Sequence, residues 1–454
     1  MRKKLINSLI TLIMTAALFL SGAVPPCVTA NAEPSTLQPE RSLKIEPNRK
    51  DYPRITATSA IMIDGGSGTV LYEKNADERR DPASITKILN AMVVLDNMEL
   101  SDTYEIPSGL ETVGHVVALK EGEVLSIEQL LYAMLLYSGN DAAEALAYAT
   151  AGDMKTFCSM MNEKAAQCGA THTNFTNANG LNNPGQENHR TTARDLSLIS
   201  KEAMKNKTFR KIVSTKTYTI PESAKAKERK IRSTNALLYE KPFKMDDKTF
   251  DFYYEGANGI KTGMTSVAGE CFIGSAKRGN TELIAVVLNA DSVEDKFKDA
   301  SKLLDYGFEN FKTCTLVKSG QVLYELKVKR GSLAAVDLGL AEDMDVTIKK
   351  GEQAEQNLNY EVVLTGAKED FVTAPVAKGS VMGQVVAYDS EGNRLAASEL
   401  IALEKVEEGG VLSRIGIADE YLPMVLVIFS MLIIGALIVI ISIRLRCYGR
   451  RDRK

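Results

Sequence analysis

Asp81-Pro82-Ala83-Ser84-Ile85-Thr86-Lys87 leads into a stretch, 84–95, whose apolar residues recur at helical spacing. Aspartate followed by proline is typical of a helix start, because Asp81 can cap the helix and Pro82 suits its first position. Ser84 then lies in the first turn, and Lys87 follows three residues later on the same face. The amine of Lys87 can therefore approach the Ser84 hydroxyl, where the helix dipole favours negative charge. This arrangement indicates a nucleophilic serine, provided that burial or a second cation makes the lysine a proton acceptor.

Two more short motifs occur in contexts that would present polar groups. Ser138-Gly139-Asn140 follows a helical stretch over 128–137 and precedes another apolar-patterned run, which predicts a loop between two helices. Lys261-Thr262-Gly263, after Asn258-Gly259-Ile260, opens a series of strand-like runs, where a glycine lets a substrate backbone approach a sheet edge. Each motif alone is weak, because a plain turn or a chance match also explains it. The three in this order and context are much more specific.

Together the motifs resemble the serine–lysine signature of penicillin-binding proteins and serine β-lactamases. The flanking sequence narrows the resemblance to low-molecular-mass penicillin-binding proteins, the serine-type D-alanyl-D-alanine carboxypeptidases of peptidase family S11. The resemblance runs from about Ser59 to Tyr306, and more loosely beyond. The segments that carry it, besides the three motifs, are Ile61-Met62-Ile63-Asp64, Tyr72-Glu73-Lys74-Asn75, Glu121-Gly122-Glu123, Asn177, Gly180-Leu181, Thr191-Thr192-Ala193-Arg194-Asp195 and Gly259-Ile260.

The resemblance implies an acyl-enzyme mechanism that needs no cofactor. Ser84 is expected to attack the peptide carbonyl between two D-alanines, with Lys87 as the general base. Ser138 would relay the proton to the leaving amine, and Asn140 would hold the substrate amide and help to position Lys87. The implied reaction releases D-alanine from peptidoglycan stem pentapeptides, which limits cross-linking. A β-lactam antibiotic would acylate Ser84 without ready release.

The resemblance also implies a substrate-binding strand. Lys261 would supply the second cation and, with Thr262, attract the terminal carboxylate of the substrate. Gly263 would let the substrate backbone approach. The oxyanion hole would consist of the backbone N–H groups of Ser84 and Met264, so the side chain at 264 is free to vary.

Three other functions use the same residue types. A D,D-endopeptidase that cuts cross-links stays open, because loop shape would distinguish it and the sequence does not show that shape. A serine β-lactamase of the class with a glutamate base has only Glu187 as a candidate between Cys168 and Asp195, in an unlike context. A membrane-anchored β-lactam sensor would have only 444–454 for cytoplasmic signalling, which is too short for a domain.

The chain departs from the family pattern in two places. Family members often have Pro-His before Gly-Leu, whereas Ala178-Asn179 stand here; we expect this to change a loop without touching the catalytic groups. Many members hold the membrane by an amphipathic helix, and here a full span replaces it.

The predicted fold class is an α/β catalytic domain over 55–313, β-lactamase/transpeptidase-like, with an antiparallel sheet and helices. Strands are expected first and last in this domain, with helices between them and one closing helix. The predicted strands are 59–63, 69–73, 260–262, 270–276 and 283–288, and the predicted helical stretches are 84–95, 127–148, 154–166, 193–204 and 293–306. Short strand-like runs after Cys314 predict a small all-β domain over 314–408, which acts as a spacer or partner surface.

Both ends of the chain carry membrane signals. Basic residues 2–4, the apolar run 5–20 and Ala30-Asn31-Ala32 predict a signal peptide over 1–32, with an uncleaved anchor as the alternative; the polar, proline-containing segment 33–54 reads as a linker. Residues 421–443 contain no charge and are long enough to span a bilayer, although a buried soluble helix is the alternative. The basic tail 444–454 predicts a cytoplasmic C-terminus. We therefore expect an exported protein anchored in the bacterial plasma membrane, with an extracytoplasmic catalytic domain.

Composition restricts the remaining possibilities. Lys+Arg 55 against Asp+Glu 58 gives a net charge of -3, so no general basic field would attract nucleic acid. The scattered cysteines and three histidines predict no metal site. Ten residues of helix would separate Cys158 from Cys168 by ~15 Å, so that pair should stay reduced. The sequence leaves open a Cys271–Cys314 bridge and the oligomeric state.

Overall fold

A computed structural model describes residues 52–110, 112–181, 185, 188–245, 248–351, 358–365, 371–388, 392 and 394–451. The predicted signal peptide, most of the predicted linker, Glu187 and the last three residues of the tail lie outside the described residues.

The catalytic domain is organised around a five-stranded antiparallel sheet. Its strand order is β2 (Val70–Lys74), β1 (Ser59–Asp64), β11 (Thr281–Ala290), β10 (Gly269–Arg278) and β9 (Ala257–Thr265). The first two strands come from the start of the domain and the other three from its end, so β1 pairs with β11 across most of the domain sequence. This leaves β9 as an edge strand.

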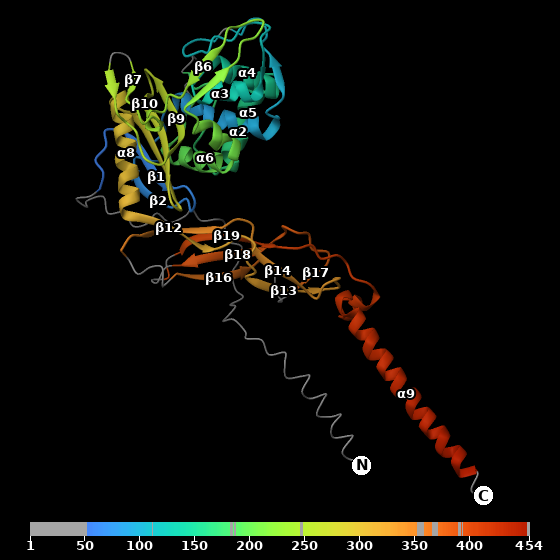
Figure 1. Ribbon diagram of the computed structural model, residues 1–454. Helices are drawn as coiled ribbons and strands as arrows, with labels where there is room; N and C mark the ends of the chain where they lie inside the picture. Colours follow the sequence, from blue (N-terminus) through green and yellow to red (C-terminus); the bar gives the residue numbers. More distant parts are fainter. Residues whose placement is uncertain are drawn as a thin grey trace.

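Helices cover both faces of this sheet, which explains why its central strands are apolar on both sides. In β1, Ile61 and Ile63 belong to the core under the main group of helices, whereas Ala60 and Met62 belong to the core under α8 (Val293–Asn310). This alternation follows from the two-residue period of a strand. Figure 1 shows α8 on one side of the sheet and the other helices on the opposite side. Those helices are α2 (Lys87–Asn97), α3 (Ile127–Leu135), α4 (Asn140–Ala151), α5 (Met154–Gln167), α6 (Ala193–Lys205) and α7 (Lys207–Val213).

Two details of the predicted helix start at Ser84 are wrong. The helix expected from Ser84 begins instead with a 3₁₀ turn, η1 (Ala83–Thr86), and α2 follows from Lys87. Asp81 does not cap it, because its carboxylate accepts a hydrogen bond from Arg190 across the domain. The loop between two helices expected at Ser138-Gly139-Asn140 is present: it divides the helical stretch 127–148 into α3 and α4, and Ser138 has a φ of 70°.

Three small hairpins were not predicted. They are β3 (Thr103–Glu105) with β4 (Val124–Ser126), β5 (Thr217–Ile220) with β6 (Arg229–Arg232), and β7 (Phe243–Met245) with β8 (Lys248–Phe250). Most of their described residues are at least partly exposed, so they lack the long apolar alternation that marks a core strand.

The C-terminal domain is all-β with a core of its own, as expected. A two-stranded sheet pairs β12 (Phe311–Val317) with β15 (Met344–Lys349). A six-stranded sheet has the order β16 (Asn359–Leu364), β18 (Val381–Tyr388), β19 (Arg394–Ala402), β14 (Ala335–Leu340), β13 (Tyr324–Lys329) and β17 (Phe371–Thr373). Buried residues from both sheets form one hydrophobic cluster.

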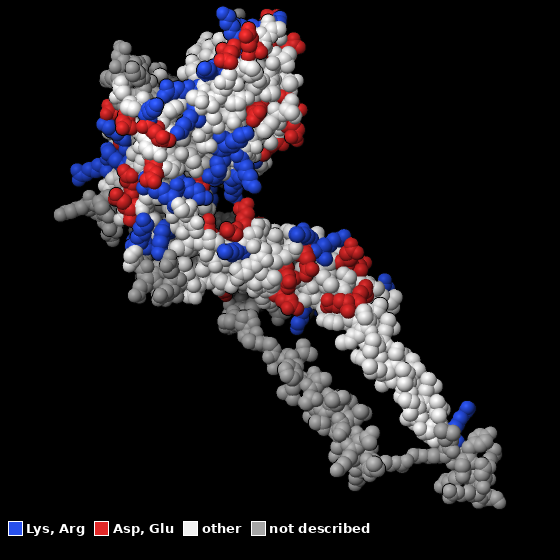
Figure 2. Space-filling model, in the orientation of Figure 1, with Lys and Arg blue, Asp and Glu red and all other residues white. Residues whose placement is uncertain are grey.

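A long apolar helix, α9 (Leu422–Arg451), ends the described chain after the short 3₁₀ turns η4 (Val411–Ile415) and η5 (Asp419–Tyr421). The stretch Asp419–Arg444, which begins in η5 and continues into α9, is long and apolar enough to cross a membrane, and none of its most apolar part is buried against the rest of the protein. Figure 2 shows this helix as an almost uncharged rod with basic side chains only near its far end. Its exposure does not fit the alternative of a buried soluble helix.

The thiols behave largely as expected. Cys158, within α5, and Cys168, the C-cap residue of the same helix, are free. Cys271 is also a free, buried thiol, so the Cys271–Cys314 bridge that the sequence left open is not formed.

Candidate active site

The buried amine of Lys87 lies at the centre of the site. The first turn of α2 carries it inward, and its Nζ donates to Ser84 Oγ at 2.8 Å, to Asn140 Oδ1 at 2.8 Å and to the Asn179 carbonyl oxygen at 2.7 Å. The side chain is fully buried. Burial, and then the positive charge of Lys261, hold the pKa of Lys87 well below its usual range. A lysine in this setting can accept the proton of the neighbouring serine.

A second buried lysine lies on β9. Lys261 Nζ donates to Ser138 Oγ at 2.9 Å and to the Thr262 carbonyl oxygen at 2.9 Å. Burial, with a smaller contribution from the charge of Lys296, lowers the pKa of Lys261 to about 7. Ser138 Oγ is thus held by the Lys261 amine, whose positive charge, when present, lowers the pKa of Lys87.

Strand β9 lies directly against the turn that carries the nucleophile. A Cβ on Gly263 would come within 3.2 Å of the Ser84 backbone nitrogen and of the Ala83 side chain, so only glycine allows this approach without displacement. The next residue, Met264, keeps its side chain 62% exposed. The two backbone N–H groups expected to form the oxyanion hole therefore belong to η1 and β9, two elements in contact. Thr262 shares a hydrogen bond of 2.6 Å with the hydroxyl of Thr234.

All eight residues singled out from the sequence belong to this one region. Ser84, Lys87 and Asn140 are joined by hydrogen bonds around the Lys87 amine. Ser138 and Lys261 form the second hydrogen-bonded pair. The remaining three, Thr262, Gly263 and Met264, follow Lys261 along the same edge strand.

Comparison with known proteins agrees with this geometry. A family model described as D-alanyl-D-alanine carboxypeptidase matches residues 46–292, which is more than half of the chain. The chain belongs to the D-alanyl-D-alanine carboxypeptidase family. A second model, the C-terminal domain of penicillin-binding protein 5, matches residues 311–408. The predicted family, enzyme class and fold class are therefore confirmed.

Relatives of this carboxypeptidase cover most of both domains. The chain is 30% identical to the D-alanyl-D-alanine carboxypeptidase DacF of Bacillus subtilis, over 83% of this chain and 93% of the relative. It is 34% identical to DacC of Escherichia coli, over 80% and 88%. The solved structure of penicillin binding protein 5 from Haemophilus influenzae matches with a TM-score of 0.62 and 30% identity, over 78% of this chain and 99% of that one.

A second solved structure covers a smaller share of this chain. A mutant of the Streptomyces K15 DD-transpeptidase has a TM-score of 0.51 and 33% identity, over 57% of this chain and 99% of that one.

The structure adds residues to the carboxypeptidase site that the motifs did not predict. The Asn179 carbonyl oxygen binds Lys87 directly, so the expectation that Ala178-Asn179 would not touch the catalytic groups is wrong. Glu144 binds the Asn179 side chain and lies four residues after Asn140, a spacing that places both on one helical face and could have indicated it. Thr234 has no such signal, because it approaches Thr262 only through the fold.

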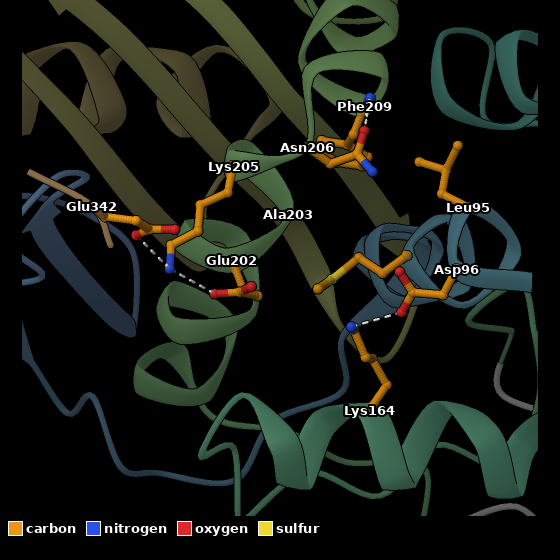
Figure 3. A pocket seen from close by; sticks show the side chains of 10 residues that line it. Leu95, Asp96, Lys164, Glu202, Ala203, Lys205, Asn206, Phe209 and Glu342 are labelled. Carbon is orange, nitrogen blue, oxygen red and sulfur yellow. Dashed lines mark hydrogen bonds and ion pairs between the residues drawn. The ribbon is translucent and has the colours of Figure 1, made fainter. Parts of the chain in front are cut away.

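No group of three or more histidine, cysteine or acidic side chains suited to a metal ion occurs among the described residues. A cavity of about 310 Å³ lies elsewhere, between the far end of α2, α5, α6, α7 and Glu342 of the second domain. As Figure 3 shows, its charged side chains are already paired, Lys164 with Asp96 and Lys205 with Glu202 and Glu342. None of the eight site residues lines it.

Proposed function

We propose that this chain hydrolyses the terminal D-alanyl-D-alanine bond of peptidoglycan stem pentapeptides through an acyl-enzyme on Ser84. The observation that carries this proposal is the fully buried Lys87 amine at 2.8 Å from Ser84 Oγ. A serine hydroxyl becomes a useful nucleophile only when a nearby base removes its proton. Family membership and the names of the relatives support the choice of substrate.

In the acylation step, neutral Lys87 takes the Ser84 proton while Oγ attacks the carbonyl carbon of the penultimate D-alanine. The N–H groups of Ser84 and Met264 stabilise the negative oxygen of the tetrahedral intermediate. The C–N bond then breaks, and Ser138 relays the proton from Lys87 to the departing amine. D-alanine leaves, and water hydrolyses the ester on Ser84 to restore the enzyme.

Substrate recognition depends on β9 and on Asn140. Lys261 and Thr262 attract the terminal carboxylate, which is a charge-assisted contact in a desolvated place. The free edge of β9 at Gly263 accepts the extended peptide backbone, and Asn140 holds the substrate amide. A β-lactam imitates the same peptide end and would remain on Ser84.

The test measures free D-alanine after incubation with a stem pentapeptide ending in D-Ala-D-Ala. The wild type should release it, and Ser84→Ala should lower the rate at least about 1,000-fold, because the acyl-enzyme cannot form. Fluorescent penicillin should label the wild type and not the variant. Labelling of Ser84 by penicillin without release of D-alanine from the pentapeptide would contradict the carboxypeptidase proposal. A cross-linked dimer offered in parallel identifies an endopeptidase, and labelling with neither substrate cleaved identifies a sensor.

We also propose that the protein is exported by a signal peptide over 1–32 and anchored by 421–443, with 444–454 in the cytoplasm. The exposed apolar surface of α9 and the basic residues that follow position 443 support this topology. The full chain should fractionate with membranes and resist a carbonate wash, whereas a chain ending at Gly410 should be released. Equal release of both chains would contradict the anchor.

A further inference from the structure

Helix α4 presents two polar side chains to the active site from one face. Asn140 and Glu144 are four residues apart, so they are neighbours on the helix surface. Asn140 receives Lys87 Nζ on its Oδ1 and donates through Nδ2 to the Val113 carbonyl oxygen at 2.8 Å. Glu144, one turn further along, contacts neither Ser84 nor Lys87 by a hydrogen bond.

The Glu144 carboxylate instead joins two segments that lie on either side of it. Thr112 Oγ1 donates to Glu144 Oε2 at 2.6 Å, and Asn179 Nδ2 donates to Oε1 at 2.8 Å. Hydrogen bonds to a carboxylate are about twice as strong as those between neutral groups. One side chain on α4 therefore holds both the segment at Thr112 and the loop at Asn179.

The Asn179 side chain is held at both ends. Its Nδ2 binds Glu144, and its Oδ1 accepts from the Leu181 backbone N–H at 2.9 Å. The carbonyl oxygen of the same residue accepts from Lys87 Nζ at 2.7 Å. Because the side chain is held at both polar atoms, the backbone of Asn179 is held in place as well, and a shift of that backbone would move the carbonyl oxygen that binds the Lys87 amine.

We propose that Glu144 is a positioning residue, which fixes the Asn179 carbonyl oxygen through the Asn179 side chain and so holds Lys87 toward Ser84. This inference rests on the proposed function, in which Lys87 is the base for Ser84. It assigns a role to a residue outside the three motifs.

The charges around Lys87 make this role measurable. Lys261, Asp141 and Glu144 are the groups whose charges act on Lys87, and the charge of Lys87 in turn acts on His115. The negative charges of Glu144 and Asp141 raise the pKa of Lys87, against burial and Lys261. Glu144→Gln keeps the shape of the side chain but removes one negative charge. The pKa of Lys87 should then fall, and the acid limb of the pH–rate profile should move to lower pH.

The experiment measures the rate of Ser84 acylation by a fluorescent penicillin between pH 5 and 9, with the full chain in detergent. The variants are Glu144→Gln, Glu144→Ala, Asn179→Ala and the double variant Glu144→Ala/Asn179→Ala. Glu163→Gln, an exposed glutamate on α5, is the matched control. Thermal melting of each variant reports whether it folds.

We expect the plateau rate of Glu144→Ala to fall about tenfold, because the base is no longer aligned, and that of Glu144→Gln to fall less. Both should move the acid limb to lower pH, while Glu163→Gln matches the wild type. The double variant should be no slower than the slower single variant, since both changes remove the same link.

If both Glu144 variants keep the acylation rate of the wild type and the wild-type position of the acid limb, the inference is overturned. The inference is also overturned if the acylation rate and the melting temperature both fall while the acid limb stays in place, because this result indicates that Glu144 has only a structural role. If penicillin does not acylate Ser84 of the wild type, the proposed function fails first, and this outcome is distinguishable from the others.

Discussion

Two lysines, Lys87 and Lys261, are buried in this protein although lysine is rarely buried without a partner of opposite charge. Both donate only to neutral oxygens among their described hydrogen bonds, from Ser84, Asn140, Asn179, Ser138 and Thr262. Burial without a carboxylate partner favours the neutral amine. The cost to stability of holding these groups is therefore linked to the reactivity of the site.

This link predicts a pH-dependent gain in stability for Lys261→Met. Burial lowers the pKa of Lys261 to about 7 in the folded protein, whereas the usual lysine value of 10.5 applies to the unfolded chain. Between these two pH values the unfolded chain binds more protons than the folded protein, so the free energy of unfolding rises with pH. At pH 6 the folded protein carries the whole cost of a buried ammonium. Lys261→Met should therefore melt above the wild type at pH 6, and the difference should shrink as the pH rises from 7 toward 10.

The control for this prediction is Lys277→Met, which changes an exposed lysine on β10. Calorimetry of the three proteins across the pH range gives the comparison. A gap between Lys261→Met and the wild type that is the same at every pH would show that Lys261 is not the titrating group.

At the scale of elements, the loop 176–181 docks on η1 so closely that one glycine is required. Gly180 has a φ of +88°, and a Cβ there would lie 1.9 Å from the Ala83 carbonyl oxygen and 2.9 Å from Thr86 Oγ1. The same loop carries Asn179, which holds Lys87. The fit of this loop on η1 therefore sets the geometry of the Ser84–Lys87 pair.

We predict that Gly180→Ala lowers the rate of acylation about 100-fold, because the loop must move by an ångström or more. Gly152→Ala is the matched control, since Gly152 ends α4 with a φ of +79° and has no neighbour within 4 Å of the added Cβ. It should cost about 1–2 kcal/mol of stability through the left-handed backbone alone, with acylation unchanged. Equal acylation rates for Gly180→Ala and Gly152→Ala would contradict the close packing of the loop 176–181 on η1.

At the scale of the whole molecule, the two domains are joined without a linker. Helix α8 ends at Asn310 and β12 begins at Phe311. The Thr313 hydroxyl donates to the buried Asp64 carboxylate of β1, and Ser67 shares a hydrogen bond of 2.6 Å with Thr347 of β15. The catalytic domain is therefore attached to the β domain by buried polar contacts, and Figure 1 shows the β domain between it and α9.

We expect Thr313→Val to destabilise the protein by about 1–3 kcal/mol, because it removes a donor from a buried carboxylate while keeping the size of the side chain. Thr315→Val, on the same strand, is the control: its hydroxyl binds Asp345 within the β domain and is less buried. Chemical unfolding monitored separately in each domain should show that Thr313→Val weakens their coupling more. If Thr315→Val destabilises the protein more than Thr313→Val does, the contact between Thr313 and Asp64 does not couple the two domains.

Much of the fold followed from local patterns. The strands of the central sheet and the helices α5, α6 and α8 lie within a few residues of their predicted ranges, because long apolar periodicity reports burial of one or both faces. The hairpins β5–β6 and β7–β8 and the short helix α7 were missed, since short, exposed elements carry little periodicity. Asp81 was assigned to a cap and instead binds Arg190, a partner that no local pattern indicates.

The sequence by itself determined which groups are available for the chemistry, and that Ser84 and Lys87 meet. Three residues along one helical turn bring two side chains together whatever surrounds them. Only the tertiary structure decided how basic Lys87 is and what holds it. Its burial, the charge of Lys261, the Asn179 carbonyl and the Glu144 carboxylate come from segments far apart along the chain. Such contacts depend on how helices and strands pack, and local spacing carries no record of that packing.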